Sequence, residues 1–254
     1  MNRLTFLGTG TSQGVPMIGC GCDVCKSLDE KDKRLRASAY VEYDGARLLV
    51  DAGPDFRQQM LREGISSLDA ILLTHNHKDH TGGLDDIRAF NYIDNKPTEI
   101  YCEKYVEDSL RMEYSYAFEE KKYPGAPEWN VHIIDERPFC INDIEITPIR
   151  GRHFRLPVLG YRFGSLAYCT DMNHIPEEEF AKLNNLDHFI INCVRRGRHI
   201  SHFSLEGALA VAEKVGAKNT WLTHLSHQLP RYQDLIKELP AGVLPAYDGL
   251  MITW

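Results

Sequence analysis

The feature that most constrains this chain is a short histidine-rich segment, residues 74–83, directly after the apolar residues 70–73. It reads Thr-His-Asn-His-Lys-Asp-His-Thr-Gly-Gly and offers four metal-binding side chains, His75, His77, Asp79 and His80. A loop at the end of a buried strand can point neighbouring side chains in different directions, and imidazole and carboxylate groups bind divalent cations. The segment therefore predicts a metal site with room for two ions. The alternative is a polar surface loop that happens to be rich in histidine.

The size and composition are those of an ordinary globular protein. The chain has 254 residues, of which 43% are hydrophobic and 26% charged, with no internal repeat or linker. A single domain spanning residues 1–254 is therefore expected. No apolar run approaches the roughly 18 residues needed to cross a bilayer, and the first residues lack a secretory apolar stretch. A cytoplasmic protein with no membrane partner is expected.

The formal net charge of −7 bears on the choice of partner. A surface that binds long nucleic acid usually carries an excess of basic side chains, because these neutralise the phosphate backbone. A nucleic-acid partner is therefore not expected. A local basic pocket for a small anion is compatible with the overall charge.

Apolar alternation and turn signals predict a mixture of strands and helices. The dipeptide Asp44-Gly45 between two apolar runs is a strong signal for a tight hairpin. Strands are expected near residues 4–7, 38–43, 47–50, 70–73, 131–134, 144–149, 159–163, 166–169, 188–192, 219–222 and 250–253. Helices are expected near residues 54–63, 103–118, 176–183, 205–215 and 232–238. Strands dominate both halves, which suggests two sheets between helical layers.

The pattern His-x-His-x-Asp-His after an apolar strand resembles the signature of the metallo-β-lactamase superfamily. The resemblance implies an α/β (α+β) fold, a four-layer αββα sandwich with metals at one edge between the sheets. It also implies a histidine, an aspartate and a histidine further along, each at a strand end. His153, Asp171 and His224 match these positions, so the resemblance covers nearly the whole chain. Taken singly, each of the three could be a core or surface polar group.

The resemblance implies a role for each of these residues. His75, His77 and His153 would hold one metal, and Asp79, His80 and His224 the other, with Asp171 bridging both. Asp51, after the strand at 47–50, would brace the histidine loop without binding a metal; otherwise it is a simple turn former. True β-lactamases of this fold carry a cysteine where this chain has Asp171, so β-lactam cleavage is not expected. The donor set suits Zn²⁺, Mn²⁺ or Fe.

A second metal site is predicted by three closely spaced cysteines, Cys20, Cys22 and Cys25. In a chain without an export signal such a cluster is more typical of metal binding than of disulfides. A closed tetrahedral zinc site needs a fourth ligand, and His227, three residues after His224, is the candidate. The alternative is a set of free thiols in a glycine-rich loop. The remaining cysteines lie in apolar stretches and are expected to be buried: Cys102, Cys140, Cys169 and Cys193.

The N-terminal segment sharpens the resemblance. Residues 8–16, Gly-Thr-Gly-Thr-Ser-Gln-Gly-Val-Pro, together with the cysteine cluster and the later His-x-x-His, look like one subgroup of the superfamily. This subgroup includes the phosphoribosyl 1,2-cyclic phosphate phosphodiesterase of phosphonate breakdown. Residues 247–250, Tyr-Asp-Gly-Leu, are similar to the closing strand of that enzyme, and Asp248 is expected to support the site without binding metal.

These residues lead to a hypothesis about the chemistry. Two cations roughly 3.5–4 Å apart can activate a water and clamp a phosphoryl group for in-line attack. We expect a phosphodiesterase that hydrolyses a small, including a cyclic, phosphodiester with a metal-bridging hydroxide as nucleophile. Asp79, Asp171 and His202 are the expected catalytic residues. His202 is assigned to protonating the leaving oxygen or binding phosphate, with a surface histidine at a helix start as the alternative.

Six arginines in two short loops imply an anionic substrate, because guanidinium matches phosphate oxygens bidentately. Arg152 and Arg198 are the expected substrate-binding residues. The alternative is that most of the six are solvated loop charges. They flank His153 and precede His202: Arg150, Arg152, Arg155, Arg195, Arg196 and Arg198.

Other activities on the same fold are left open by the sequence. One is a nuclease that processes RNA 3′ ends, although such enzymes carry a basic arm for tRNA that has no counterpart here. Others are hydrolysis of a thioester or lactone, and metal binding without catalysis. A homodimer is implied only by the family resemblance. The aromatic segment 103–129 could cap the site, form a dimer contact or pack as core.

Overall fold

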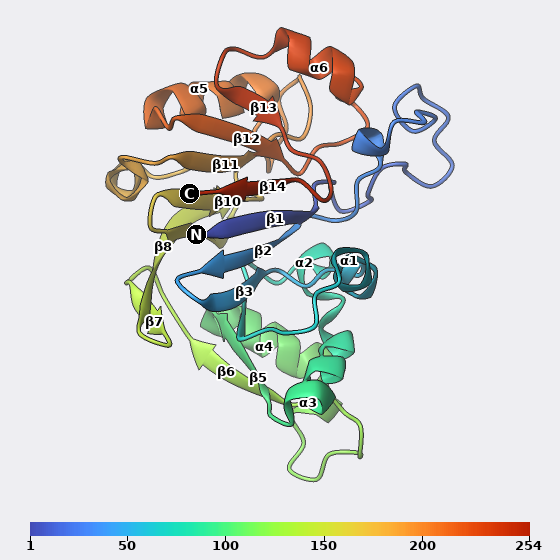
Figure 1. Ribbon diagram of the computed structural model, residues 1–254, viewed down its shortest axis with the longest axis vertical. Coiled ribbons are helices and arrows are strands. Elements are labelled where there is room, and N and C mark those ends of the chain that lie inside the picture. The colour runs from blue at the N-terminus through green and yellow to red at the C-terminus, as the bar shows by residue number, and fades with distance from the viewer.

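The computed structural model describes residues 1–254 and contains two seven-stranded sheets that face each other, with helices on their outer sides (Figure 1). The first sheet has the order β14-β1-β2-β3-β4-β5-β6, and the second has the order β13-β12-β11-β10-β9-β8-β7. Each is mixed, because antiparallel hairpins lie at one side and parallel strands at the other. This is the metallo-β-lactamase sandwich, so the expected fold class is confirmed.

The strands have the following bounds. In the first sheet they are β1 (Arg3–Gly8), β2 (Ser38–Tyr43), β3 (Ala46–Val50), β4 (Ala70–Leu72), β5 (Thr98–Cys102), β6 (Trp129–Ile133) and β14 (Met251–Thr253). In the second they are β7 (Phe139–Ile141), β8 (Ile144–His153), β9 (Leu156–Phe163), β10 (Leu166–Cys169), β11 (His188–Asn192), β12 (Asn219–Thr223) and β13 (Val243–Pro245).

The helices lie between these strands along the chain. The α-helices are α1 (Phe56–Glu63), α2 (Lys78–Thr81), α3 (Arg88–Asp94), α4 (Lys104–Glu113), α5 (Leu205–Val215) and α6 (Tyr232–Glu238). The 3-10 helices are η1 (Glu30–Asp32), η2 (Leu84–Ile87), η3 (Ser115–Ala117) and η4 (Glu177–Leu183). None of the helices combines the length and the apolar character that a bilayer crossing would require.

Alternation along the strands divides the core into layers. In β3, Leu48 and Val50 point into the cluster between the two sheets, whereas Leu49 points into the cluster beneath the helices of the first sheet. This follows from the two-residue period of a strand, which sends successive side chains to opposite faces. A third cluster lies between the second sheet and α5. Both faces of each sheet are therefore covered, as parallel strands require.

Local signals in the sequence explain several element ends. Asp44 and Gly45 both have positive φ, 47° and 92°, and Tyr43 pairs with Ala46, so the expected two-residue hairpin is confirmed. Helix α5 begins after Ser204, whose side chain accepts a hydrogen bond from the Gly207 amide, and ends at Gly216 in the left-handed conformation.

The structure also corrects some expectations. The helix expected at 176–183 is a 3-10 helix, and the one expected at 103–118 is α4 followed by the short η3. Strands β5, β7 and β13 and helices α2 and α3 were not expected. Cys140 is exposed, because in the edge strand β7 it alternates with the inward-facing Ile141. The other three cysteines expected to be buried are so.

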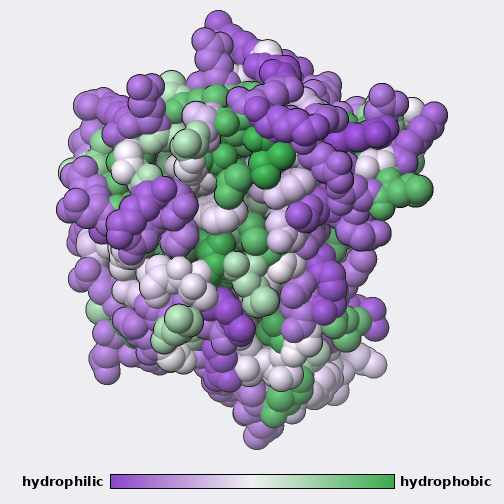
Figure 2. Space-filling view, turned by 45° about the horizontal axis from the view of Figure 1, so that its top comes forward, coloured by the Kyte–Doolittle hydropathy of each residue, from purple (hydrophilic) through white to green (hydrophobic).

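The outer surface is mainly hydrophilic on the face shown in Figure 2, where apolar side chains gather toward the middle. The end of the sandwich that matters for function is the one where β4, β8, β10 and β12 finish. Each of these strands is followed, or ended, by a histidine or an aspartate from the sequence analysis.

Candidate metal centre

Four strand ends deliver the candidate metal ligands to one place. His75 lies three residues after β4, His153 is the last residue of β8, and Asp171 and His224 follow β10 and β12 closely. Asp171 and His224 have positive φ, 54° and 53°, a conformation that is strained for residues other than glycine. Each bend turns the side chain out of the strand direction. Such strained residues often mark functional sites.

The structure brings together the seven residues expected to bind two metals. The rings of His75 and His77 lie 4.6 Å apart, and those of His77 and His153 lie 5.0 Å apart. The second group consists of Asp79, His80, Asp171 and His224, whose candidate ligand atoms all lie within 4.8 Å of one another.

Asp171 belongs to more than one cluster of candidate ligands. One of its oxygens lies 3.0 Å from His80 Nε2, and the other lies 3.2 Å from His224 Nε2. Asp171 also belongs to a further cluster with His153 and His202, again with ligand atoms within 4.8 Å. Asp171 is therefore shared between the cluster of Asp79, His80 and His224 and a cluster that contains His153, a ligand expected for the other metal.

Unpartnered nitrogens show that this donor set fits cations. Six ring nitrogens in the cluster are buried and make no hydrogen bond: His75 Nε2, His80 Nε2, His153 Nδ1, His202 Nδ1 and both nitrogens of His224. A buried polar atom without a partner is destabilising, so such atoms are rare in native proteins. Their lone pairs can instead bind divalent metals, which matches an imidazole and carboxylate donor set. The His/Asp cluster is therefore consistent with active-site metals.

Asp51 and Thr74 orient the two deepest histidines. Asp51 is fully buried; it accepts hydrogen bonds from Thr74 N at 2.8 Å and Thr74 Oγ1 at 2.9 Å, and lies 2.6 Å from His80 Nδ1. The Thr74 hydroxyl also lies 2.9 Å from His75 Nδ1. With both Nδ1 protons held in this way, a cation would bind at each Nε2 and displace any proton carried there. The position of Asp51 fits its expected bracing role, whereas the sequence analysis missed Thr74.

Burial and charge act against each other in this cluster. Burial alone would lower the pKa of His80, but the carboxylates of Asp171, Asp79 and Asp51 outweigh it and raise that pKa well above its usual value. Burial would likewise raise the pKa of Asp171, but His224 and His80 hold it well below its usual value. Asp171 therefore stays ionised, as a cation ligand must. Burial lowers the pKa of His202 to about 3, so its imidazole is neutral at pH 7.

The cysteine cluster forms a second candidate site. Cys20 Sγ and Cys22 Sγ lie 3.3 and 3.5 Å from His227 Nδ1, and the ligand atoms of all four residues, including Cys25, lie within 4.8 Å of one another. A hydrogen bond from the backbone of Cys25, and then His227, lower the pKa of Cys22 to about 6. Three thiols and one imidazole at this separation are consistent with a structural zinc. This Cys₃His group ties the N-terminal loop to the turn after β12.

Two clefts open beside the His/Asp cluster. One, of about 770 Å³, is lined by Arg195, Arg198, His199 and His202, and the other, of about 800 Å³, by His77, His153 and Arg155. Phe154 and Ile200 line both clefts and are largely exposed. Of these residues, His199 was not expected at the site. Its place near His202, with ring centroids 4.9 Å apart, follows from the loop and not from any sequence signal.

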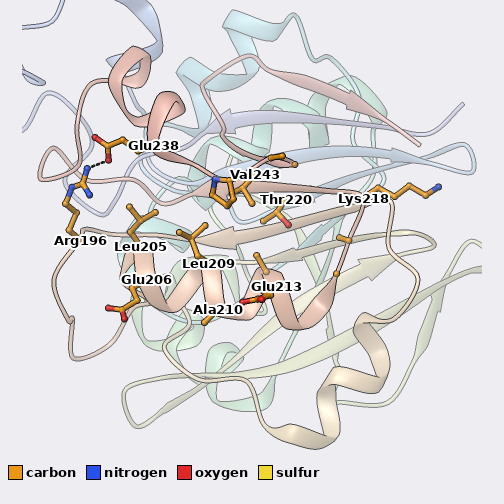
Figure 3. Close-up of a pocket in the computed structure, with 16 residues that line it drawn as sticks. Arg196, Leu205, Glu206, Leu209, Ala210, Glu213, Lys218, Thr220, Glu238 and Val243 are labelled. Carbon is orange, nitrogen blue, oxygen red and sulfur yellow. Dashed lines mark hydrogen bonds and ion pairs between the residues drawn. The ribbon is translucent and has the colours of Figure 1, made fainter.

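Three of the six arginines, Arg155, Arg195 and Arg198, line the two clefts, and the other three do not. Arg150 is paired with Glu103 and Glu136, at 2.6 and 2.8 Å, so its charge is already neutralised. Arg152 is exposed and next to buried His153 in β8; because successive side chains alternate, it lies on the opposite face and lines neither cleft. Arg196 instead pairs with Glu238 in a cleft of about 970 Å³ between α5 and residues 238–243 (Figure 3).

Asp248 supports the site indirectly, through hydrogen bonds to residues near β1 and β2. It accepts hydrogen bonds from Thr9 N and Oγ1 and from Leu35 N at 2.8–2.9 Å, and it contacts no candidate ligand. The carbonyl of Thr9 in turn accepts a hydrogen bond at 2.7 Å from the amide of Leu225, next to His224. Asp248 therefore holds β1 and the turn that carries His224.

The chain resembles several known proteins. It is 43% identical, over 98% of its length, to an octanoyltransferase of Porphyromonas gingivalis, but it spans only about half, 51%, of that longer protein. It is 30% identical to coenzyme PQQ synthesis protein B of Methylococcus capsulatus, over 98% of this chain and 99% of that one. A crystal structure of a diphosphatase from the PhnP family superposes with a TM-score of 0.93 at 39% identity, covering 100% of this chain and 98% of that one.

The sequence also matches a protein-family model. Residues 46–225, which include β3 to β12 and all seven candidate ligands of the two active-site metals, match the β-lactamase superfamily domain. His224 also falls within this range, so the whole His/Asp cluster lies in the matched region. From the sandwich, the ligands at its edge and this match, the chain belongs to the metallo-β-lactamase superfamily.

Proposed function

We propose that this chain is a metal-dependent phosphodiesterase that acts on a small anionic ester, cyclic esters included. The observation that carries the proposal is that Asp171 belongs both to the cluster with Asp79, His80 and His224 and to the cluster with His153 and His202, beside an open cleft with two arginines. The 39% identical neighbour is a diphosphatase, and cleavage of diphosphates and of phosphodiesters both require attack at phosphorus. Two divalent cations, when bound, would supply Lewis acidity and lower the pKa of a bound water.

We propose the following roles for the residues of the chain. His75, His77 and His153 would hold one cation, and Asp79, His80 and His224 the other, with Asp171 as the residue shared between them. A Zn²⁺ or Mn²⁺ pair suits these donors, with Fe as a further option, and the Cys₃His group holds a structural zinc. Asp51 fixes the ring of His80, as its 2.6 Å contact supports.

His202 and Arg198 face the substrate in this proposal. His202 lines the cleft beside Asp171, so a ring N–H can donate to a phosphoryl or leaving oxygen, which suits either of its two expected roles. The unpaired Arg198 in the same cleft can offset the negative charge that develops on phosphorus. Arg152 is replaced in this role by Arg195, which lines the cleft.

The test is a side-by-side assay of the purified, metal-loaded chain on four substrates: bis(p-nitrophenyl) phosphate, a ribose cyclic phosphate, a dinucleoside diphosphate and precursor tRNA. Hydrolysis of a small diester that Asp171→Ala abolishes supports the proposal. Cleavage of the diphosphate alone would narrow the activity to phosphoanhydrides, and cleavage of precursor tRNA alone would favour the nuclease.

A second candidate is thioester chemistry at the same metals, because the 43% identical relative is an octanoyltransferase. The shared region is about half of that protein, so its activity is not assigned to this half. An octanoyl thioester added to the assay separates the two functions: turnover of the thioester with none of the phosphodiesters would reject our proposal. A chain that binds metals and turns over none of these substrates would favour metal binding without catalysis.

A further inference from the structure

Strand β11 lies between the two strands that supply Asp171 and His224, yet it supplies no metal ligand itself. It pairs in parallel with β10 on one side and with β12 on the other. Its last residue, Asn192, is fully buried, although burial of an amide side chain gains no hydrophobic stabilisation. A buried amide in this position therefore needs a polar explanation.

Asn192 clamps the backbone next to Asp171. Its Oδ1 accepts a hydrogen bond from Met172 N at 2.8 Å, and its Nδ2 donates to Met172 O at 2.9 Å. The same carbonyl also accepts a hydrogen bond from Phe203 N at 2.8 Å, and Phe203 directly follows His202. One residue, Met172, thus joins the loop of Asp171 to the loop of the candidate substrate-binding histidine.

The residues after Asn192 make similar contacts on the other side. Cys193 N donates to Thr223 O at 2.8 Å, immediately before His224. The carbonyl of Val194 accepts from Ser226 N at 3.3 Å and from its hydroxyl at 2.5 Å. Ser226 lies in the turn between His224 and the histidine of the Cys₃His group. Residues 192–194 therefore contact every ligand-bearing loop of the second sheet except that of β8.

We infer that Asn192 is a positioning residue that sets Asp171 relative to His202. Asp171 is held at positive φ, so its loop would relax to another conformation if the adjacent peptide were released. Asn192 provides both hydrogen bonds by which β11 restrains the backbone N–H and C=O of Met172, the residue after Asp171. The role rests on the proposed function only in so far as Asp171 and His202 serve the same reaction, because the effect on metal binding does not depend on the substrate.

The test compares Asn192→Leu, which keeps the branched shape and the number of side-chain heavy atoms and removes both hydrogen bonds, with Asn192→Asp, which keeps an acceptor for Met172 N. Full-length variants are loaded with zinc, and their metal content, zinc affinity and hydrolysis of bis(p-nitrophenyl) phosphate are measured. Loss of an outer partner of this kind typically costs about 10- to 100-fold in metal affinity or activity. We expect Asn192→Leu to lose that much in zinc affinity of the His/Asp cluster and in kcat, with a smaller change in KM. Asn192→Asp should lie between it and the parent.

The matched control is Ile191→Ala, since Ile191 is equally buried in β11 but contacts the apolar cluster beneath α5. It should lower Tm at least as much as Asn192→Leu while keeping zinc affinity and kcat at the parent level. Parent-like zinc affinity and kcat in both Asn192 variants would overturn the inference, and so would an equal loss in Ile191→Ala. If the parent hydrolyses no phosphodiester, the proposed function fails, but the zinc affinities still decide the role of Asn192.

Discussion

At the scale of single residues, the clearest assignment of a proton is at His188, far along β11 from the metal centre. Its Nδ1 lies 3.0 Å from Trp221 Nε1, and its Nε2 lies 3.1 Å from the carbonyl of Thr253. An indole nitrogen only donates and a carbonyl only accepts, so Nδ1 must be bare and Nε2 must carry the proton. The neutral imidazole can make both hydrogen bonds, whereas the charged form would place a proton on Nδ1 against the N–H of Trp221.

This arrangement predicts a pH dependence of stability. Burial lowers the pKa of His188, so between that lowered value and about 6.5 the unfolded chain binds a proton that the folded chain does not. The free energy of unfolding should therefore fall as pH drops below about 6.5. His188→Gln can make both hydrogen bonds without titrating, so it should lose less stability on acidification than the parent. Urea unfolding of both proteins at several pH values measures this, and a difference independent of pH would contradict it.

The arginines give a second prediction at this scale. Arg198 lines the cleft that contains His202, whereas Arg196, two residues earlier, pairs with Glu238 in another cleft. Arg198→Ala should therefore lower kcat/KM for a phosphodiester about 10-fold, the size expected for a hydrogen bond to a charged group. Arg196→Ala should leave kcat/KM unchanged. Steady-state kinetics of the two variants check this, and equal effects would show that general charge, not position, matters.

At the scale of elements, the Cys₃His group joins the N-terminal loop to the turn after β12. If the group binds zinc, the ion stabilises the folded chain by mass action: about 2.7 kcal/mol when the free metal is 100 times its Kd. His227→Ala should therefore remove one metal ion per chain and lower Tm by roughly 5–10 °C. Metal analysis and thermal unfolding measure both. If His227→Ala retained the full metal content, the Cys₃His site would be wrong.

A matched control exists on the same loop. Gln228, next to His227, contributes only its backbone amide to a hydrogen bond with Ser226, so Gln228→Ala should change neither metal content nor Tm appreciably. The ions of the His/Asp cluster should stay in place in His227→Ala, because His224 is held separately through Thr9 and Leu225.

Elements and ligands differ in how far the sequence predicts them. The Asp44-Gly45 hairpin and the central strands were predictable because their signals are local. The histidine loop was predictable because its ligands are close together in the sequence, directly after an apolar strand. Strand β5 mixes polar and apolar residues, and β13 has only three residues and ends in a proline, so the local signal for each is weak and their pairing comes from strands distant in the sequence. The paired state of Arg150 could not be predicted either, since Glu103 and Glu136 reach it only in the folded chain.

At the scale of the whole molecule, the candidate ligands come from both sheets. The histidine loop follows β4 of the first sheet, whereas His153, Asp171 and His224 follow strands of the second. Hydrogen bonds reinforce this junction: Leu159 N donates to Thr74 O at 3.0 Å, and the Tyr161 hydroxyl donates to Leu73 O at 2.6 Å. Cations held here would link the two halves of the sandwich.

This leads to a prediction about metal removal. The chain should hold about three ions, two in the His/Asp cluster and one in the Cys₃His group. Chelation should lower Tm and leave one cooperative transition, as we propose for a single domain with a core shared by both sheets. Calorimetry with and without chelator measures this. An unchanged Tm would argue against ions between the sheets, and two separate transitions would argue against a single domain. Light scattering on the same samples tests the homodimer that the family resemblance implies.

Because both sheets supply ligands, metal availability should affect how long this protein persists before it is degraded. If metal binding both completes the active site and stabilises the two-sheet fold, a shortage of the ion lowers stability as well as activity. The emptied chains open more often, and open chains are what proteases degrade. The amount of this protein, and not only its specific activity, would then follow the availability of its metal.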